Sequence, residues 1–328
     1  IGGNMKLKKV ILIVLLVLIW AAIIFLIVKP GKKVEKKDVT KINVVASNFA
    51  SYDFLRAVTN GVDKINLKFL LGPGKDAHSF DPTAQDIAEV QNANVFVYIG
   101  GTMEAWADKV LKSDFDKSKL KVIKVTDSVN TIEEQDVDGA EPEKEEEEVE
   151  GAFDEHIWTS PENAKKMVKY LAEKMGEIDP ENAYKYTKNA NEYIAKIEKV
   201  DNEIRAIVNA KVRDRLVFAD KMPMQYFLNY YGLKASAAFN GCSTEFEPSS
   251  KTIAGLVKIV KKNNIPVVLY IELNDGKVAN TIAKEAGNGV KAMQIQTLHN
   301  VSLDDYKNGE TYVSLMNRNL NVLKAALD

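Results

Sequence analysis

The chain has 328 residues, of which 27% are charged and 46% hydrophobic, and its formal net charge is −2. This length allows one large domain or two medium ones. The sequence has no broad basic face and no nucleic-acid-binding motif, so we expect no nucleic-acid partner. The single cysteine, Cys242, excludes an intramolecular disulfide framework and a Cys-rich zinc site, and is typical of a small buried hydrophobe.

The N-terminus begins with a basic segment, 1–9, followed by nineteen unbroken apolar residues, 10–28. At ~1.5 Å per residue this run can span a bilayer core of ~30 Å. It is longer than a usual signal peptide core of ~7–15 residues, and no clear cleavage site follows. We therefore expect a membrane anchor, with a polar tether at 29–40. A cleaved signal, giving a secreted protein, stays open.

From residue 41 onward, short β-type runs alternate with helical patterns. The expected strands are 42–47, 65–72, 95–101, 122–127, 215–220, 234–239, 266–273 and 291–298. The expected helices are 49–61, 81–93, one containing Trp106, 160–178, 179–211, 224–232, 249–263, 277–287 and about 309–327. For the helix at 81–93 we expect Asp81 as N-cap and Pro82 in the first helical position.

This alternation predicts an α/β fold with two Rossmann-like lobes, each a mainly parallel four-stranded sheet flanked by helices. We expect the first lobe at 41–180 and the second at 212–328. The segment 181–211 lies within a helical pattern too long for a compact domain to contain, so it braces one domain or spans two. No Gly-x-Gly-x-x-Gly or Walker pattern follows a strand, which makes nucleotide binding unexpected.

The chain has only three histidines, and each follows an expected strand. His78 lies in "GPGKDAHSFDPTAQDI", His156 comes before a helix at Pro161, and His299 closes the run 291–298. Asp220 ends the strand 215–220. Ligands of open parallel sheets bind outside the carboxyl ends of the strands, so His78, His156, Asp220 and His299 suit one ligand held between two lobes.

Three imidazoles and a carboxylate are common ligands of zinc, whereas Ca²⁺ needs mostly oxygen and Mn²⁺ usually takes more oxygen. The sequence thus predicts a Zn²⁺ site, with Mn²⁺ possible. For each histidine alone, a capping or surface role is the simpler interpretation, and only their joint placement favours a metal.

Several segments resemble the metal-binding solute-receptor family of ABC importers (cluster A-I), which contains zinc and manganese uptake receptors. The resemblance extends from about Lys41 to Leu327. The segments that carry it are "GPGKDAHSFDPTAQDI", "NVFVYIGGTMEAW", "DEHIWTSPENA", "YFLNYYGL" and "TEFEPSSKTIAGL". It implies two lobes joined by one long rigid helix, with the metal between them, and it matches His78 and His156 to family ligands.

The second lobe departs from the family pattern. The family's third ligand, a His or Glu ten residues before the Tyr of Y-G-L, falls on Lys221, whose ammonium group cannot ligate while protonated. Asp220 is the natural substitute. The family's fourth ligand falls near Gln296, and His299 can replace it. Glu247 also matches a family position, although an acid there suits a helix start.

The segment 133–155 carries thirteen acidic residues against Lys144. It falls where zinc receptors of this family often insert a His-rich loop. We expect a solvated, disordered loop, with weak cation attraction as the alternative.

Together with the resemblance, these features predict an extracytoplasmic receptor that captures Zn²⁺ and delivers it to the permease of a metal ABC importer, as a monomer and without catalysis. The alternatives are a manganese receptor of the same family, a metal-dependent hydrolase using His78, His156 and Asp220, or a surface adhesin.

Overall fold

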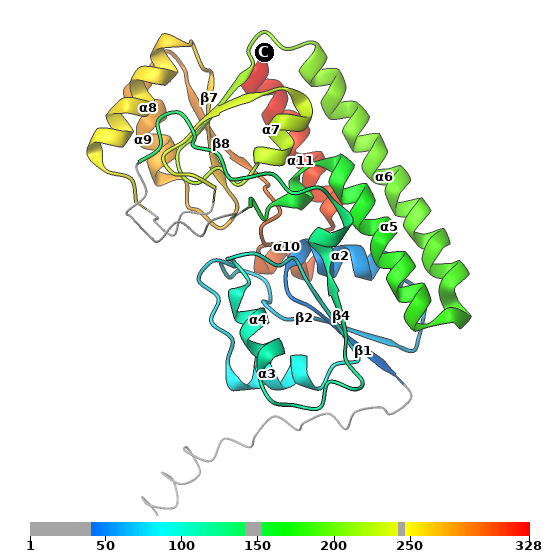
Figure 1. Ribbon diagram of the computed structural model, residues 1–328. Coiled ribbons are helices and arrows are strands. Elements are labelled where there is room, and N and C mark those ends of the chain that lie inside the picture. The colour runs from blue at the N-terminus through cyan, green and yellow to red at the C-terminus, as the bar shows by residue number, and fades with distance from the viewer. Residues whose placement is uncertain (1–40, 142–152, 242–246) are drawn as a thin grey trace, which may run out of the picture. The chain divides into compact units, whose positions relative to one another are not determined.

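The computed structural model describes residues 41–141, 153–241 and 247–328. Its first sheet has the order β2-β1-β3-β4 and its second the order β6-β5-β7-β8, and every neighbouring pair is parallel. The strands are β1 (Ile42–Ala46), β2 (Ile65–Phe69), β3 (Val95–Tyr98), β4 (Lys121–Lys124), β5 (Arg215–Phe218), β6 (Lys234–Ser236), β7 (Val267–Ile271) and β8 (Lys291–Ile295). The predicted α/β fold with two parallel four-stranded sheets is confirmed. We call the first sheet and its helices lobe one, and the second sheet and its helices lobe two (Figure 1).

Helices cover both sheets, as buried parallel strands require. The α-helices are α2 (Phe49–Val58), α3 (Ala84–Gln91), α4 (Ala105–Lys112), α5 (Pro161–Ile178), α6 (Ala183–Asn209), α7 (Gln225–Tyr231), α8 (Ser250–Lys262), α9 (Lys277–Ala286), α10 (Leu303–Lys307) and α11 (Tyr312–Leu327). Short 3₁₀ turns lie at Val125–Ser128, Ile157–Thr159 and Pro180–Asn182. In the described part of the chain, no helix is both long enough and apolar enough to cross a membrane.

The 27-residue helix α6 connects the lobes. At ~1.5 Å per residue it is about 40 Å long. It contacts α5 and α2 on the side of lobe one, and it contacts α11, which packs against β5, β7 and β8 of lobe two (Figure 1). One hydrophobic core runs through these elements, from Val44 in β1 to Leu269 in β7. The two lobes are thus packed on a shared core.

Several predicted element boundaries are wrong, and three of them bear on the site or the caps. Helix α3 is capped by Thr83 rather than Asp81, because Thr83 and Asp86 form a reciprocal capping box. The predicted helix from about 309 begins at Tyr312 with Thr311 as its cap, and the short helix α10 precedes it. The run 291–298 forms a strand only to Ile295, so His299 stands four residues beyond the strand end.

The predicted anchor at 10–28, the tether at 29–40, Cys242 and residues 142–152 of the acidic segment lie outside the described residues. The described ends of the acidic segment contact each other and lobe two. Glu133 forms a β-bridge with Phe153, and Asp138 forms one with Ser236 of β6. Glu133 and Asp138 are both exposed, as expected of a solvated segment, but their β-bridges contradict the expected disorder.

Candidate metal centre

His78 stands in the loop between β2 and α3. Gly72 and Gly74 have φ values of 73° and 75°, a region in which glycine carries no Cβ penalty. The loop is bound to lobe two, because Gly74 N donates to Val301 O at 2.8 Å and Asn300 Nδ2 donates to Gly72 O at 3.1 Å. These bonds place the His78 loop against the segment that carries His299.

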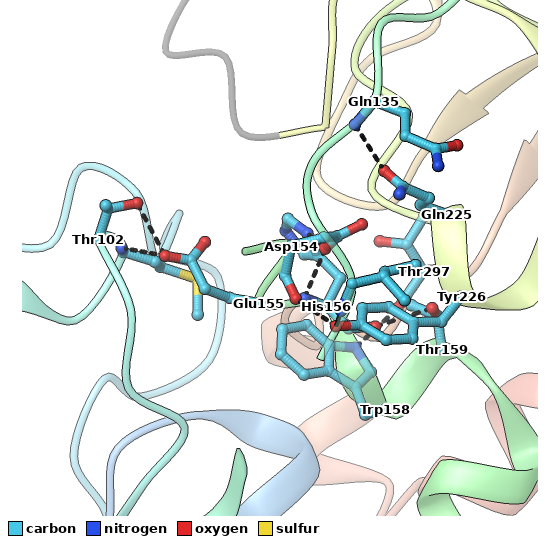
Figure 2. A network of polar contacts seen from close by, with 12 residues as sticks. Thr102, Gln135, Asp154, Glu155, His156, Trp158, Thr159, Gln225, Tyr226 and Thr297 are labelled. Atoms are coloured by element: carbon cyan, nitrogen blue, oxygen red, sulfur yellow. Dashed lines mark hydrogen bonds and ion pairs between the residues drawn. The ribbon is translucent and has the colours of Figure 1, made fainter. Parts of the chain in front are cut away.

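His156 is fully buried just before α5. Its Nδ1 lies 2.8 Å from Asp154 Oδ1, which also accepts the His156 backbone N–H at 2.8 Å (Figure 2). The Asp154 backbone carbonyl in turn accepts from Tyr226 of lobe two at 2.8 Å. A carboxylate on Nδ1 favours a proton there and leaves the Nε2 lone pair for a ligand.

His299 is held by a buried carboxylate. Glu272, just after β7, accepts hydrogen bonds from His299 N at 2.8 Å and from Thr297 N at 2.7 Å. Between them, Leu298 takes a φ of 62°, which is rare for a residue other than glycine. The His299 ring stacks on Trp158, with ring centroids 6.2 Å apart and planes 10° apart. Among the described residues, His299 Nε2 is buried without a hydrogen-bond partner.

The three imidazoles converge, with one potential ligand nitrogen from each lying within 4.8 Å of the other two. His78 Nε2 and His156 Nε2 are 3.4 Å apart. Two nitrogens bound at ~2.0–2.1 Å to a tetrahedral zinc ion lie about 3.3–3.4 Å from each other. The observed separation therefore fits two ligands of one ion, and His299 supplies a third nitrogen from lobe two.

Burial sets the protonation of this cluster. It lowers the pKa of His78 and of His299, and the charges of His156 and Lys221 lower both further. Burial also opposes protonation of His156, but the charge and hydrogen bond of Asp154 outweigh it and raise the pKa of that ring. His78 and His299 are thus held neutral, the form that ligates a metal.

With this geometry established, comparison with known proteins gives a family. The model of a family described as "Zinc-uptake complex component A periplasmic" (ZnuA) matches residues 44–326. The chain belongs to the ZnuA family. The family is one of uptake-complex components, which agrees with the expectation that the protein is not an enzyme.

Two zinc-binding relatives are similar to this chain in sequence. The zinc-binding lipoprotein AdcA of Streptococcus pneumoniae is 32% identical over 294 residues, which are 90% of this chain and 57% of AdcA. The chain thus spans little more than half the length of that relative. The high-affinity zinc uptake system protein ZnuA of Bacillus subtilis is 30% identical over 292 residues, which are 88% of this chain and 88% of that protein.

A crystal structure of the Zn(II)-bound ZnuA-like domain of S. pneumoniae AdcA superposes with a TM-score of 0.73, covering 88% of this chain and 99% of that domain at 32% identity. The laminin-binding protein Lmb of Streptococcus agalactiae is described as a bifunctional protein with adhesin and metal-transporting activity. Its structure superposes with a TM-score of 0.72, and the match covers 88% of this chain and 100% of the Lmb chain. At 24% identity, Lmb shows a shared fold only.

Asp220 does not join the histidines in this ZnuA-family chain. Within the described residues, the group of close potential ligands contains only the three imidazoles. Asp220 Oδ2 accepts from Ile271 N at 3.4 Å, while Oδ1 is buried with no described partner. Burial raises the pKa of Asp220 to about 7.

The structure also shows the surroundings of the other lobe-two candidates. Gln296 is bound to Gln294 and to Asn319, and Glu247 is exposed. Lys221 is buried, and its Nζ lies 3.5 Å from Asp76 Oδ2 of lobe one.

Two functional residues were missed from the sequence, Asp154 and Glu272. Asp154 had a signal, because a carboxylate two residues before His156 can reach its imidazole. Glu272 had a weaker one, an acid at the carboxyl end of the apolar strand β7. Whether Glu272 accepts hydrogen bonds from the segment that carries His299 depends on the path of that loop, and the pattern of residues alone does not give this path.

Proposed function

We propose that this protein is an extracytoplasmic receptor that captures Zn²⁺ between its two lobes and passes it to the permease of an ABC importer. The observation that carries the proposal is the convergence of three imidazoles, the half-buried His78 and the buried His156 from lobe one and the buried His299 from lobe two. Neutral imidazole suits zinc, and the absence of a carboxylate from this group of described residues disfavours manganese. The printed names of AdcA and ZnuA support the same cargo.

We propose His78, His156 and His299 as ligands. Asp220 stays a prediction for the fourth position, and its side chain would have to move toward the imidazoles to fill it. The lobes at 41–180 and 212–328, with the linking helix 181–211, are proposed as the two halves that enclose the ion. Hydrogen bonds across the cleft, such as Trp158 Nε1 to Thr297 O at 3.0 Å, support this arrangement.

We further propose that the protein acts as a monomer and that residues 10–28 anchor it outside the cytoplasmic membrane. The nineteen-residue apolar run supports the anchor. Deletion of 10–28 should move the protein from the membrane fraction of cells to the soluble fraction. Retention of the deleted form in membranes would contradict the anchor.

The metal proposal is tested on the full chain in mild detergent, by zinc titration against a chromophoric chelator. One Zn²⁺ should bind per chain. His78→Ala should weaken binding more than about 100-fold, since loss of even an outer hydrogen-bond partner costs 10–100-fold. Ser79→Ala, a change at the neighbouring exposed residue, should leave binding intact. Equal affinity in His78→Ala and the unmodified protein would refute the proposal.

A surface adhesin is the second candidate, and it has the Lmb fold in its favour. An adhesin activity independent of the metal would survive the loss of all three histidines, so binding to immobilised laminin by the triple alanine variant separates it from metal uptake.

A further inference from the structure

A tyrosine of lobe two contacts the segment that holds a proposed ligand of lobe one. Tyr226, in α7, is 6% exposed, and its hydroxyl donates to the backbone carbonyl of Asp154 at 2.8 Å (Figure 2). The same hydroxyl oxygen accepts the backbone N–H of Ile132 at 3.1 Å. Since an amide N–H can only donate and a carbonyl oxygen can only accept, the hydroxyl hydrogen points to Asp154.

These contacts close a ring of hydrogen bonds around the backbone of Asp154. The Asp154 backbone N–H donates to Ile132 O at 2.9 Å, so the two residues are joined directly as well as through the Tyr226 hydroxyl. Asp154 is buried, and a buried backbone group that loses its partner costs free energy. The position of Asp154 is therefore set jointly by the chain at Ile132 and by lobe two.

Asp154 is also the residue that orients His156. Its Oδ1 lies 2.8 Å from His156 Nδ1 and accepts the backbone N–H of the same histidine at 2.8 Å. An outer carboxylate of this kind fixes the tautomer and the direction of a ligating imidazole. A shift of the Asp154 backbone would carry the carboxylate away from His156, so Tyr226 reaches a proposed ligand through two successive hydrogen bonds.

The two ends of α7 are bonded to different parts of the protein. At its first residue, Gln225 Nε2 donates to Glu133 O at 2.8 Å and Gln225 Oε1 accepts the Gln135 backbone N–H at 3.1 Å (Figure 2). At its last residue, the hydroxyl of Tyr231 donates to Asp201 of α6 at 2.9 Å. The first end of α7 thus holds the chain that leads to the metal cluster, and the last end holds the connecting helix.

We infer that Tyr226 is a positioning residue of the zinc site, because its hydroxyl fixes Asp154 and, through Asp154, the imidazole of His156. The inference rests on the proposed zinc function and deepens it. Lobe two then supplies one proposed ligand, His299, and also orients a proposed ligand of lobe one. Withdrawal of α7 would free Asp154 and loosen His156, so zinc release would accompany separation of the lobes at this helix.

The test compares Tyr226→Phe with the unmodified full chain in mild detergent, by zinc titration against a chromophoric chelator and by the rate of zinc release to excess chelator. Loss of a direct outer partner costs a metal site about 10–100-fold in affinity, so loss of a partner one bond further out should cost about fivefold. Zinc release should become faster by a similar factor. The visible absorption of bound Co²⁺ should also change, because one imidazole is less well oriented.

Tyr231→Phe is the matched control, because it removes a hydroxyl from a buried tyrosine of the same helix. That hydroxyl donates to a carboxylate, so its loss should lower the melting temperature at least as much as Tyr226→Phe does. Zinc affinity, zinc release and the Co²⁺ spectrum should nevertheless stay unchanged.

A double-mutant cycle shows whether Tyr226 acts through Asp154. Asp154→Ala removes the carboxylate that links the tyrosine to His156, so adding Tyr226→Phe to it should lower zinc affinity by less than about twofold more.

Three results would overturn the inference while leaving zinc binding intact. The first is equal zinc affinity and release in Tyr226→Phe and the unmodified protein. The second is an equal loss of zinc affinity in Tyr231→Phe, which would make the effect one of stability alone. The third is an undiminished cost of Tyr226→Phe in the Asp154→Ala protein, which would mean that the hydroxyl acts by another route. Failure of the unmodified protein to bind zinc would refute the proposed function itself.

Discussion

Replacing Glu272 by Gln should loosen the loop that carries His299. The two carboxylate oxygens of Glu272 accept four hydrogen bonds in a fully buried site. Oε1 accepts from Thr297 Oγ1 at 2.8 Å, His299 N at 2.8 Å and Asn300 N at 3.4 Å, while Oε2 accepts from Thr297 N at 2.7 Å. Every one of these contacts needs an acceptor, and a glutamine side chain offers only one acceptor oxygen.

The cost follows from the best orientation that glutamine can take. With its oxygen in the place of Oε1, the amide NH₂ faces Thr297 N, and two donors oppose each other. A buried donor left unpaired costs about 1–3 kcal/mol. We therefore expect Glu272→Gln to lower the free energy of unfolding by about 2 kcal/mol, which corresponds to about 4–8 °C in melting temperature. Because His299 N is held by the same carboxylate, zinc affinity should also fall, by about tenfold.

Chemical denaturation and chelator competition measure the two effects. Glu285→Gln, a charge-neutralising change on the exposed side of α9, is the matched control and should leave both quantities unchanged. The view that this carboxylate positions His299 would be refuted by two results together. These are a free energy of unfolding of Glu272→Gln within about 0.5 kcal/mol of that of the unmodified protein, and an equal zinc affinity.

Three further predictions concern the same cleft. Asp154→Asn should lower zinc affinity by about 10–100-fold, measured by chelator competition, because the orientation of His156 is lost; an unchanged affinity would contradict this. Trp158→Phe should cost about 1 kcal/mol in denaturant unfolding, because it removes the bond to Thr297 O; no change would show that the bond adds no net stability. Zinc affinity should fall about tenfold per pH unit as the pH drops through the raised pKa of His156, because one proton then competes with the ion for that ring; a flat affinity from pH 7.5 to 5 would contradict imidazole ligation.

The fold could be predicted because buried parallel strands are continuous apolar runs. The same property makes their ends hard to predict. The run 65–72 stays apolar through Leu70 and Leu71, but the strand ends at Phe69. The cap of α3 was ambiguous, since Asp81 and Thr83 both suit an N-cap, and the reciprocal bond with Asp86 decides for Thr83.

The convergence of the three histidines could be predicted from one rule, that ligands gather at the carboxyl ends of parallel strands. The rule is coarse, because it places residues at an edge without their side-chain directions. Asp220 obeys it as well as His299 does, yet its carboxylate faces the backbone of Ile271. Which strand-end residue reaches the centre is decided by loop paths, such as the turn at Leu298, that no periodicity records.

The contacts around Trp158 explain why two of the three imidazoles are positioned as a pair. Its ring lies edge-on to His156 and stacked on His299, with centroids 5.4 Å and 6.2 Å away. Its backbone carbonyl accepts from Tyr312 of α11 at 2.9 Å, and its indole N–H donates to Thr297 O. The ring is fully buried, so it cannot turn without disturbing both imidazoles and the bond to Thr297. Two proposed ligands from different lobes are therefore held in fixed relation before any metal arrives, and fewer side chains would remain to be ordered when it binds.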